Sequence, residues 1–153
     1  MSASLHLEPL PGSLRRACLF TEKTLGIWGL ERLTDVASLV VAELVANGFE
    51  HAGTAVALDL QNSDGGVRIS VRDGARIARE NQKQRDKSTP PRGLSLVSAL
   101  ASDWGVEATE TGKVVWAVIP EDLHDDEPAE RRTYFSVNPR LRLRWEAWRR
   151  RRA

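Results

Sequence analysis

The chain has 153 residues, a net charge of +1, 41% hydrophobic and 28% charged residues, which suits one compact domain with a buried core. Its sequence shows no apolar run long enough to span a bilayer and no signal-peptide pattern, so we expect no membrane association and a cytoplasmic location. The single cysteine, Cys18, excludes an internal disulfide, and the near-neutral charge argues against strong overall attraction to nucleic acid.

The elements predicted along the chain alternate between helices and hairpins. Residues 2–11 alternate and end on a proline, which is typical of an edge strand. Ser13 is expected to cap the first helix, and Gly53 to stop the second. In order, we predict a strand in residues 2–11, helices from Ser13 to near Gly26 or Gly29 and from about Asp35 to His51, strands in residues 54–60 and 67–73, a helix in residues 92–102, and strands in residues 104–108 and 114–119.

This order predicts one α+β domain followed by a charged tail. Helices and hairpins in this alternation give a two-layer sandwich, with a mixed, largely antiparallel sheet and helices on one face. We expect the domain to span residues 1–120. Residues 121–153 hold an acidic linker and then nine arginines with Trp145 and Trp148. This tail is compatible with a protein groove, with nucleic acid, or with folding back on the linker; the net charge favours the protein partner.

A polar stripe on the second predicted helix carries the strongest functional signal. Glu43, Asn47 and His51 recur every four residues beside an apolar face. Polar groups at the edge of a core need partners. A magnesium ion with a chain of phosphates satisfies all three, because Asn47 offers an oxygen, His51 a donor N–H, and Glu43 a carboxylate that holds a water. The alternative interpretation is an amphipathic helix whose polar side happens to carry these residues.

Two later segments add candidate contacts. The strand in residues 67–73 ends on Asp73, and the polar loop in residues 74–91 has the length of a lid or binding loop. The helix that follows this loop begins with a glycine, and the N–H groups of a first helical turn favour phosphate. The candidate phosphate-binding residues are therefore Arg92, Gly93, Leu94 and Ser95.

Together these segments resemble the boxes of the Bergerat-fold ATP-binding superfamily, which includes DNA gyrase, histidine kinases and bacterial anti-sigma-factor serine kinases. The resemblance is strongest to small anti-sigma-type ATP-binding regulators of actinobacteria, from about Gly12 to Pro120, including the Ala-Leu-Ala-x-x-Trp-Gly stretch at residues 99–105. It implies that Asp73 accepts a hydrogen bond from the adenine amino group. It also implies that Glu43 is the general base, which orients a water or a protein serine for attack on the γ-phosphate.

Several positions depart from this family pattern. The glycines expected after Asp73 are Ala75 and Ile77, the first glycine expected before the last helix is Pro91, and the threonine expected on the closing strand is Val114. Pro91 has no N–H to offer a phosphate. These departures predict lowered nucleotide affinity, and phosphate transfer depends on positioning that they disturb.

The first hypothesis is a regulator of the anti-sigma factor type that binds ATP and Mg²⁺, and that phosphorylates a serine on its partner if it is an active kinase. The partner would be a sigma factor or an anti-anti-sigma-like antagonist, and a homodimer is compatible with Leu19, Ile27 and Trp28 on the first helix. The alternative is a degenerate, non-catalytic scaffold of the same fold that binds a protein partner with weak ATP binding or none. A nucleic-acid role through the tail ranks third.

Overall fold

The described part of the protein folds as one antiparallel sheet covered by helices on one face. The computed structural model describes residues 1–74 and 94–122. The elements are β1 (Ser2–Leu7), α1 (Ser13–Ile27), η1 (Glu31–Leu33), α2 (Thr34–Ala52), β2 (Val56–Ser63), β3 (Gly66–Asp73), α4 (Ser95–Leu100), β4 (Asp103–Ala108) and β5 (Lys113–Pro120).

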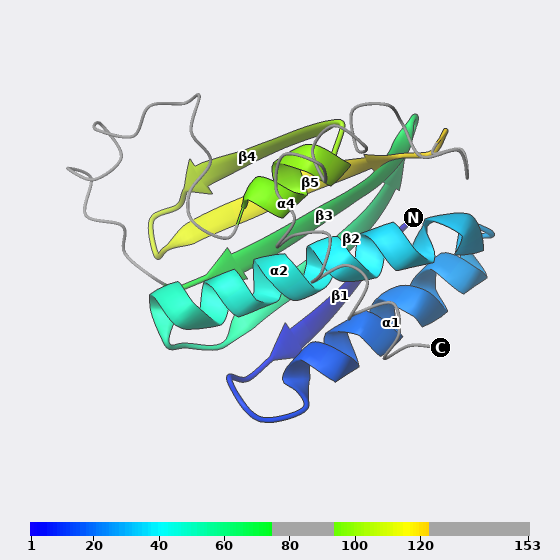
Figure 1. The fold of residues 1–153 in the computed structure, drawn as a ribbon. Coiled ribbons are helices and arrows are strands. Elements are labelled where there is room, and N and C mark those ends of the chain that lie inside the picture. Colours follow the sequence, from blue (N-terminus) through cyan, green and yellow to red (C-terminus); the bar gives the residue numbers. More distant parts are fainter. Residues whose placement is uncertain (75–93, 123–153) are drawn as a thin grey trace.

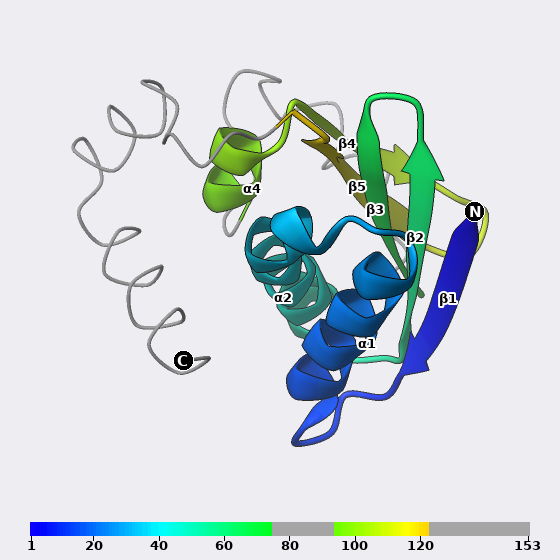
Figure 2. The same ribbon diagram turned by 90° about the vertical axis from the view of Figure 1, so that its right-hand side faces the viewer.

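Within residues 1–74 and 94–122, five strands lie in the order β1-β2-β3-β5-β4 (Figure 1). Each of the four strand pairings is antiparallel, so the α+β sandwich predicted from the sequence is confirmed, and the sheet is antiparallel throughout. Figure 2 shows α1, α2 and α4 on the same side of this sheet. The layer between sheet and helices is hydrocarbon, with Leu44, Leu58 and Ile69 among its fully buried side chains.

Helix α2 owes its central position to its composition. Most of its length is apolar, and residues 36–41 are buried without interruption because α1 covers one side of the helix and the sheet covers the other. The helix ends where predicted, since Gly53 adopts a left-handed conformation with φ of 63° and its N–H donates to the carbonyl of Phe49.

The prediction that Ser13 caps the first helix is wrong, because the Ser13 side chain makes no capping hydrogen bond. Gly12, with φ of 86°, is the residue before α1, and Ser13 is already the first helical residue. The Ser13 hydroxyl donates to the carbonyl of Glu8 at 2.6 Å, which ties the helix to the chain leaving β1. A serine signals a helix start correctly here, but its hydroxyl serves the preceding loop and not the first turn.

The helix predicted in residues 92–102 is shorter in the structure. Its described part, α4, ends at Leu100, because Ala101 is extended and the N–H of Ser102 donates to the carbonyl of Val118 on β5. Strand pairing therefore ends the helix two residues early. Leu94, Leu96 and Leu100 are buried, so α4 is held by packing on the core.

The face of the sheet opposite the helices carries polar and aromatic side chains. The guanidinium carbon of Arg68 on β3 lies 4.4 Å from the ring centroid of Trp116 on β5, a cation–π contact. Gly105 on β4 makes room for this indole, because a Cβ there would come within 2.8 Å of the ring. This open face is distinct from the helix-covered face that holds the candidate site.

Candidate functional site

The polar stripe predicted on α2 runs from partial burial to solvent. Asn47 is only 6% exposed, Glu43 is half-buried, and His51 is exposed in the last turn. Among the described residues, the Asn47 carboxamide forms no side-chain hydrogen bond. Its amide atoms are not among the fully buried side-chain atoms that lack a partner, so this carboxamide is accessible to solvent or to a ligand.

A close approach between α2 and the sheet brings Gly48, the residue after Asn47, against Val56 at the start of β2. A Cβ at Gly48 would lie 2.9 Å from Cγ1 of Val56 and 3.5 Å from Cγ1 of Val71. Val56 is the register partner of Asp73. The glycine therefore lets the C-terminal half of α2 rest on the strand ends that carry Asp73, and the sequence analysis did not recognise this role.

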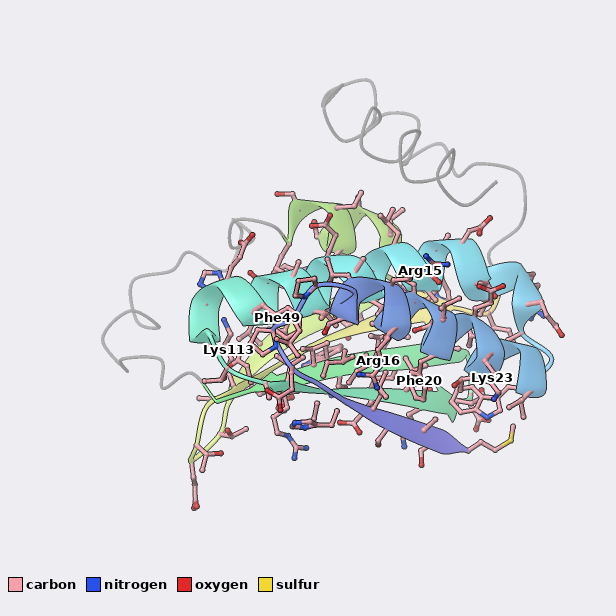
Figure 3. All side chains as sticks on the ribbon, turned by 90° about the horizontal axis from the view of Figure 1, so that it is seen from below. Arg15, Arg16, Phe20, Lys23, Phe49 and Lys113 are labelled. Carbon is pink, nitrogen blue, oxygen red and sulfur yellow. The ribbon has the colours of Figure 1, made fainter. Side chains whose placement is uncertain are left out.

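Asp73 lies where the sequence predicted it, as the last residue of β3, but it is not alone. Its register partner on β5 is Lys113, and Nζ of Lys113 lies 3.8 Å from Oδ2 of Asp73. The side chains are 1% exposed for Asp73 and 9% for Lys113. Figure 3 shows Lys113 at the end of the molecule where α2 finishes. The candidate base-binding carboxylate is thus part of a buried ion pair.

The backbone holds this pair in register. A Cβ at Gly112 would come within 2.0 Å of the carbonyl oxygen of Asp73, so only glycine permits the approach of the β5 start to the β3 end. The N–H of Thr109 donates to the carbonyl of Gly112 and closes the preceding turn. Lys113 is consequently fixed beside Asp73 by two strands and one tight turn.

Lys113, the register partner of Asp73 on β5, lies on the same face of the sheet as Asp73, whereas Val114 lies on the opposite face. Buried residues alternate along β5, with Lys113 and Val115 inside and Val114 half-buried on the open face. Lys113 could have been found from the sequence, because it falls in phase with Val115, Ala117 and Ile119 in a strand that alternates. An inward-facing lysine in such a pattern indicates a buried charge with a partner.

The phosphate-binding positions are described only in part. Arg92 and Gly93 lie outside the described residues, as do Ala75, Ile77 and Pro91 of the loop. Leu94 precedes α4 with its side chain buried in the core, so only its backbone N–H remains for a ligand. Ser95 opens α4, and its carbonyl accepts a hydrogen bond from the Ser98 hydroxyl at 2.9 Å. Their role in holding phosphate remains a prediction.

Sequence comparison with known families decides how this arrangement is to be interpreted. Residues 7–119 match the model of the histidine kinase-like ATPase domain, a stretch that contains α2, β3, α4 and nearly all of β5. The chain belongs to the histidine kinase-like ATPase family. No curated protein matches the chain significantly. Family membership implies an ATP-binding function, and the roles of Glu43, Asn47 and Asp73 in a nucleotide site stay predictions.

The donor set suits a magnesium ion that a nucleotide brings with it. Within residues 1–74 and 94–122, no three His, Cys, Asp or Glu side chains gather as a metal-binding cluster. Mg²⁺ bound through phosphates needs only one or two protein oxygens, since phosphates and waters complete its octahedron. The carboxamide oxygen of Asn47 fits that requirement, and Glu43 lies one helical turn away to hold a water.

The described part of the chain offers no helix that is a candidate membrane span. Within residues 1–74 and 94–122, no helix combines the length and the hydropathy needed to cross a bilayer.

Proposed function

We propose that this protein binds Mg-ATP and regulates transcription through a protein partner, in the manner of an anti-sigma factor or serine-protein kinase. The observation that carries the proposal is the carboxamide of Asn47, which is 6% exposed and belongs to the residue before Gly48, where α2 packs on Val56, the register partner of Asp73. Family membership over residues 7–119 supports the nucleotide. The resemblance of residues 99–105 to anti-sigma-type regulators supports the regulatory role.

Each residue has a distinct role in this proposal. Asn47 supplies an oxygen to Mg²⁺, and His51, which is exposed, donates an N–H to a phosphate. Asp73 contacts the base. The phosphate contacts are assigned to residues 92–95, of which Ser95 opens α4. Glu43 orients the attacking oxygen, either a water or a serine hydroxyl of an anti-anti-sigma-like partner, because phosphoryl transfer depends mainly on positioning and charge stabilisation.

Calorimetric titration of the purified protein with ATP tests the nucleotide site directly. The parent is expected to bind ATP in the presence of Mg²⁺ and to lose affinity when the metal is removed. Asn47→Ala should abolish this magnesium dependence. Asn62→Ala, a half-exposed amide on β2 away from α2, is the matched control and should behave as the parent. Absence of ATP binding up to millimolar concentration would reject the proposal.

Catalysis is tested separately from binding. If phosphate is transferred to a cognate protein serine, Glu43→Gln should reduce the transfer rate by about two to four orders of magnitude while ATP still binds. Glu50→Gln, an exposed carboxylate on the same helix, is the matched control. Transfer by Glu43→Gln at the parent rate would show that Glu43 is not the base.

The second candidate function is a non-catalytic scaffold of the same fold with weak ATP binding or none. It is favoured by the state of Asp73, whose side chain is 1% exposed and ion-paired with Lys113. A nucleobase has to compete for a carboxylate that is already engaged. Partner binding that is unaffected by ATP, together with a flat ATP titration, would favour the scaffold.

The partner surface is proposed on α1 and on the tail. Leu19 and Ile27 of α1 are exposed, whereas Trp28 is half-buried against the core, so the first two suit a homodimer or a partner contact. The Arg- and Trp-rich tail lies outside the described residues. Deleting residues 131–153 should weaken the partner complex and leave ATP binding intact, as measured by pull-down and titration.

A further inference from the structure

We propose that the Asp73–Lys113 pair, and not Asp73 alone, reads the nucleobase, and that it admits 6-oxopurines as well as adenine. The inference rests on the proposed nucleotide function. Lys113 would be the residue that determines base specificity.

The geometry supplies a donor and an acceptor at one point of the sheet. Asp73 and Lys113 are register partners, so their side chains leave β3 and β5 on the same face, with 3.8 Å between Nζ and Oδ2. That face is the one covered by α2, since Val56, the other register partner of Asp73, is buried beneath Gly48. Both charges are withdrawn from solvent, which strengthens their interactions with any polar ligand atom.

A carboxylate alone discriminates strongly between purines. It accepts a hydrogen bond from the 6-amino group of adenine, but the 6-oxo group of guanine or hypoxanthine would bring two acceptors together. An ammonium group offers three donors and removes this conflict. The presence of Lys113 therefore changes which base edges the site can match.

The pair can match both purines, because Asp73 and Lys113 exchange the positions, 6 and N1, that they contact in the two bases. With adenine, the 6-amino group donates to Asp73, and Lys113 donates to the lone pair on N1. With a 6-oxopurine, Lys113 donates to O6 and the N1–H donates to Asp73. Each base thus satisfies the buried carboxylate and the buried ammonium together, which avoids the penalty of leaving one charge without a partner.

The position of the lysine is fixed closely enough to have this effect. Gly112 packs on the backbone of Asp73, where a Cβ would come within 2.0 Å of its carbonyl oxygen, so the start of β5 lies directly against the end of β3. Lys113 is 9% exposed and confined beside the carboxylate. A solvent-exposed lysine would sample many positions and contribute little discrimination.

Titration with Mg-ATP and Mg-inosine triphosphate tests the inference, since the two bases differ only at position 6 and in the proton on N1. The parent is expected to bind both with affinities within about tenfold of each other. Lys113→Met should weaken inosine triphosphate at least about tenfold more than ATP, because O6 loses its donor. Arg72→Met is the matched control, because it removes a cation next to Asp73 on the open face, and it should leave the ratio unchanged.

The outcomes separate this inference from the proposed function. A parent that binds ATP but rejects inosine triphosphate by more than about a hundredfold overturns the inference and leaves the function standing. Equal weakening of both nucleotides by Lys113→Met overturns it as well. If neither nucleotide binds, both proposals fail. The parent comparison needs no variant, so the inference stays testable if Lys113→Met does not fold by circular dichroism.

Discussion

At each end of the β3–β5 pairing a glycine packs on the backbone of the neighbouring strand, but the side chains buried beneath the two ends differ. At one end Gly66 packs on β5, where a Cβ would lie 2.1 Å from the carbonyl oxygen of Ile119. At the other end Gly112 packs on β3 against the carbonyl of Asp73. Beneath the first end lie hydrocarbon side chains such as Val67, and beneath the second lies the Asp73–Lys113 ion pair.

This difference separates the contacts that are enough to close the β3–β5 pairing from the charged contact that the proposed ligand site uses. The Gly66 end shows that a glycine contact and buried hydrocarbon close this pairing without any internal charge. A buried ion pair is weak evidence for stability, because desolvation offsets most of the attraction. The charged end is therefore the end at which the proposed ligand recognition can be tested.

Breaking the ion pair should have the largest effect. Lys113→Met leaves the Asp73 carboxylate buried without its cation and should lower the free energy of unfolding by about 3–5 kcal/mol. Ile119→Val, a truncation at the hydrocarbon end, should cost about 0.5–1.5 kcal/mol. Urea unfolding followed by circular dichroism measures both.

The double variant Asp73→Asn, Lys113→Met sharpens this result. It removes both charges and should recover much of the stability that Lys113→Met loses, since a buried amide costs far less than a buried carboxylate without its cation. If the free energy of unfolding of Lys113→Met lay within about 1 kcal/mol of the parent's, the two ends would be energetically alike, contrary to the comparison.

Filling the two glycine contacts should have an intermediate effect. Gly112→Ala and Gly66→Ala each force backbone atoms apart and should cost about 1–3 kcal/mol. Only Gly112→Ala should also weaken Mg-ATP binding, because it shifts Lys113 relative to Asp73. Gly26→Ala is the control, since nothing lies within 4 Å of that position on α1 and alanine favours the helix. Equal loss of nucleotide affinity in both strand variants would contradict a localised site.

The smallest effect is expected on the open face. Arg68→Met removes the cation over Trp116 and should cost about 0.5–1 kcal/mol, with nucleotide affinity unchanged. Thermal unfolding and an ATP titration measure the two quantities. Reduced ATP affinity in this variant would mean that the two faces of the sheet are coupled, and the site would then extend beyond the helix-covered face.

The elements that were predictable from sequence are those set by local rules. Gly53 ends α2 because it can adopt a positive φ, and the alternation of residues 67–73 places Asp73 at a strand end. The stop of α4 at Leu100 was not predictable from its periodicity, because a hydrogen bond from Ser102 to Val118 on another strand decides it. Tertiary pairing overrides local preference there.

The residues of the candidate site were predictable from the sequence, but the contacts between them were not. The four-residue spacing of Glu43, Asn47 and His51 is visible in the sequence, as is Asp73. The partnership of Asp73 with Lys113 depends on the β3–β5 register. The close approach of α2 to the sheet depends on the contact of Gly48 with Val56. Both are relations between distant segments, which a single sequence does not display.

The β3–β5 pairing also bears on how the protein folds. Gly66 pairs with Pro120 and Asp73 with Lys113, so the chain must close a long loop before these contacts form, whereas a tight turn joins β2 to β3. We expect the β2–β3 hairpin to form early and Asp73 to meet Lys113 late in folding. Substitutions in the ion pair should therefore accelerate unfolding more than they slow refolding, and the lifetime of the intact base site should follow the unfolding rate.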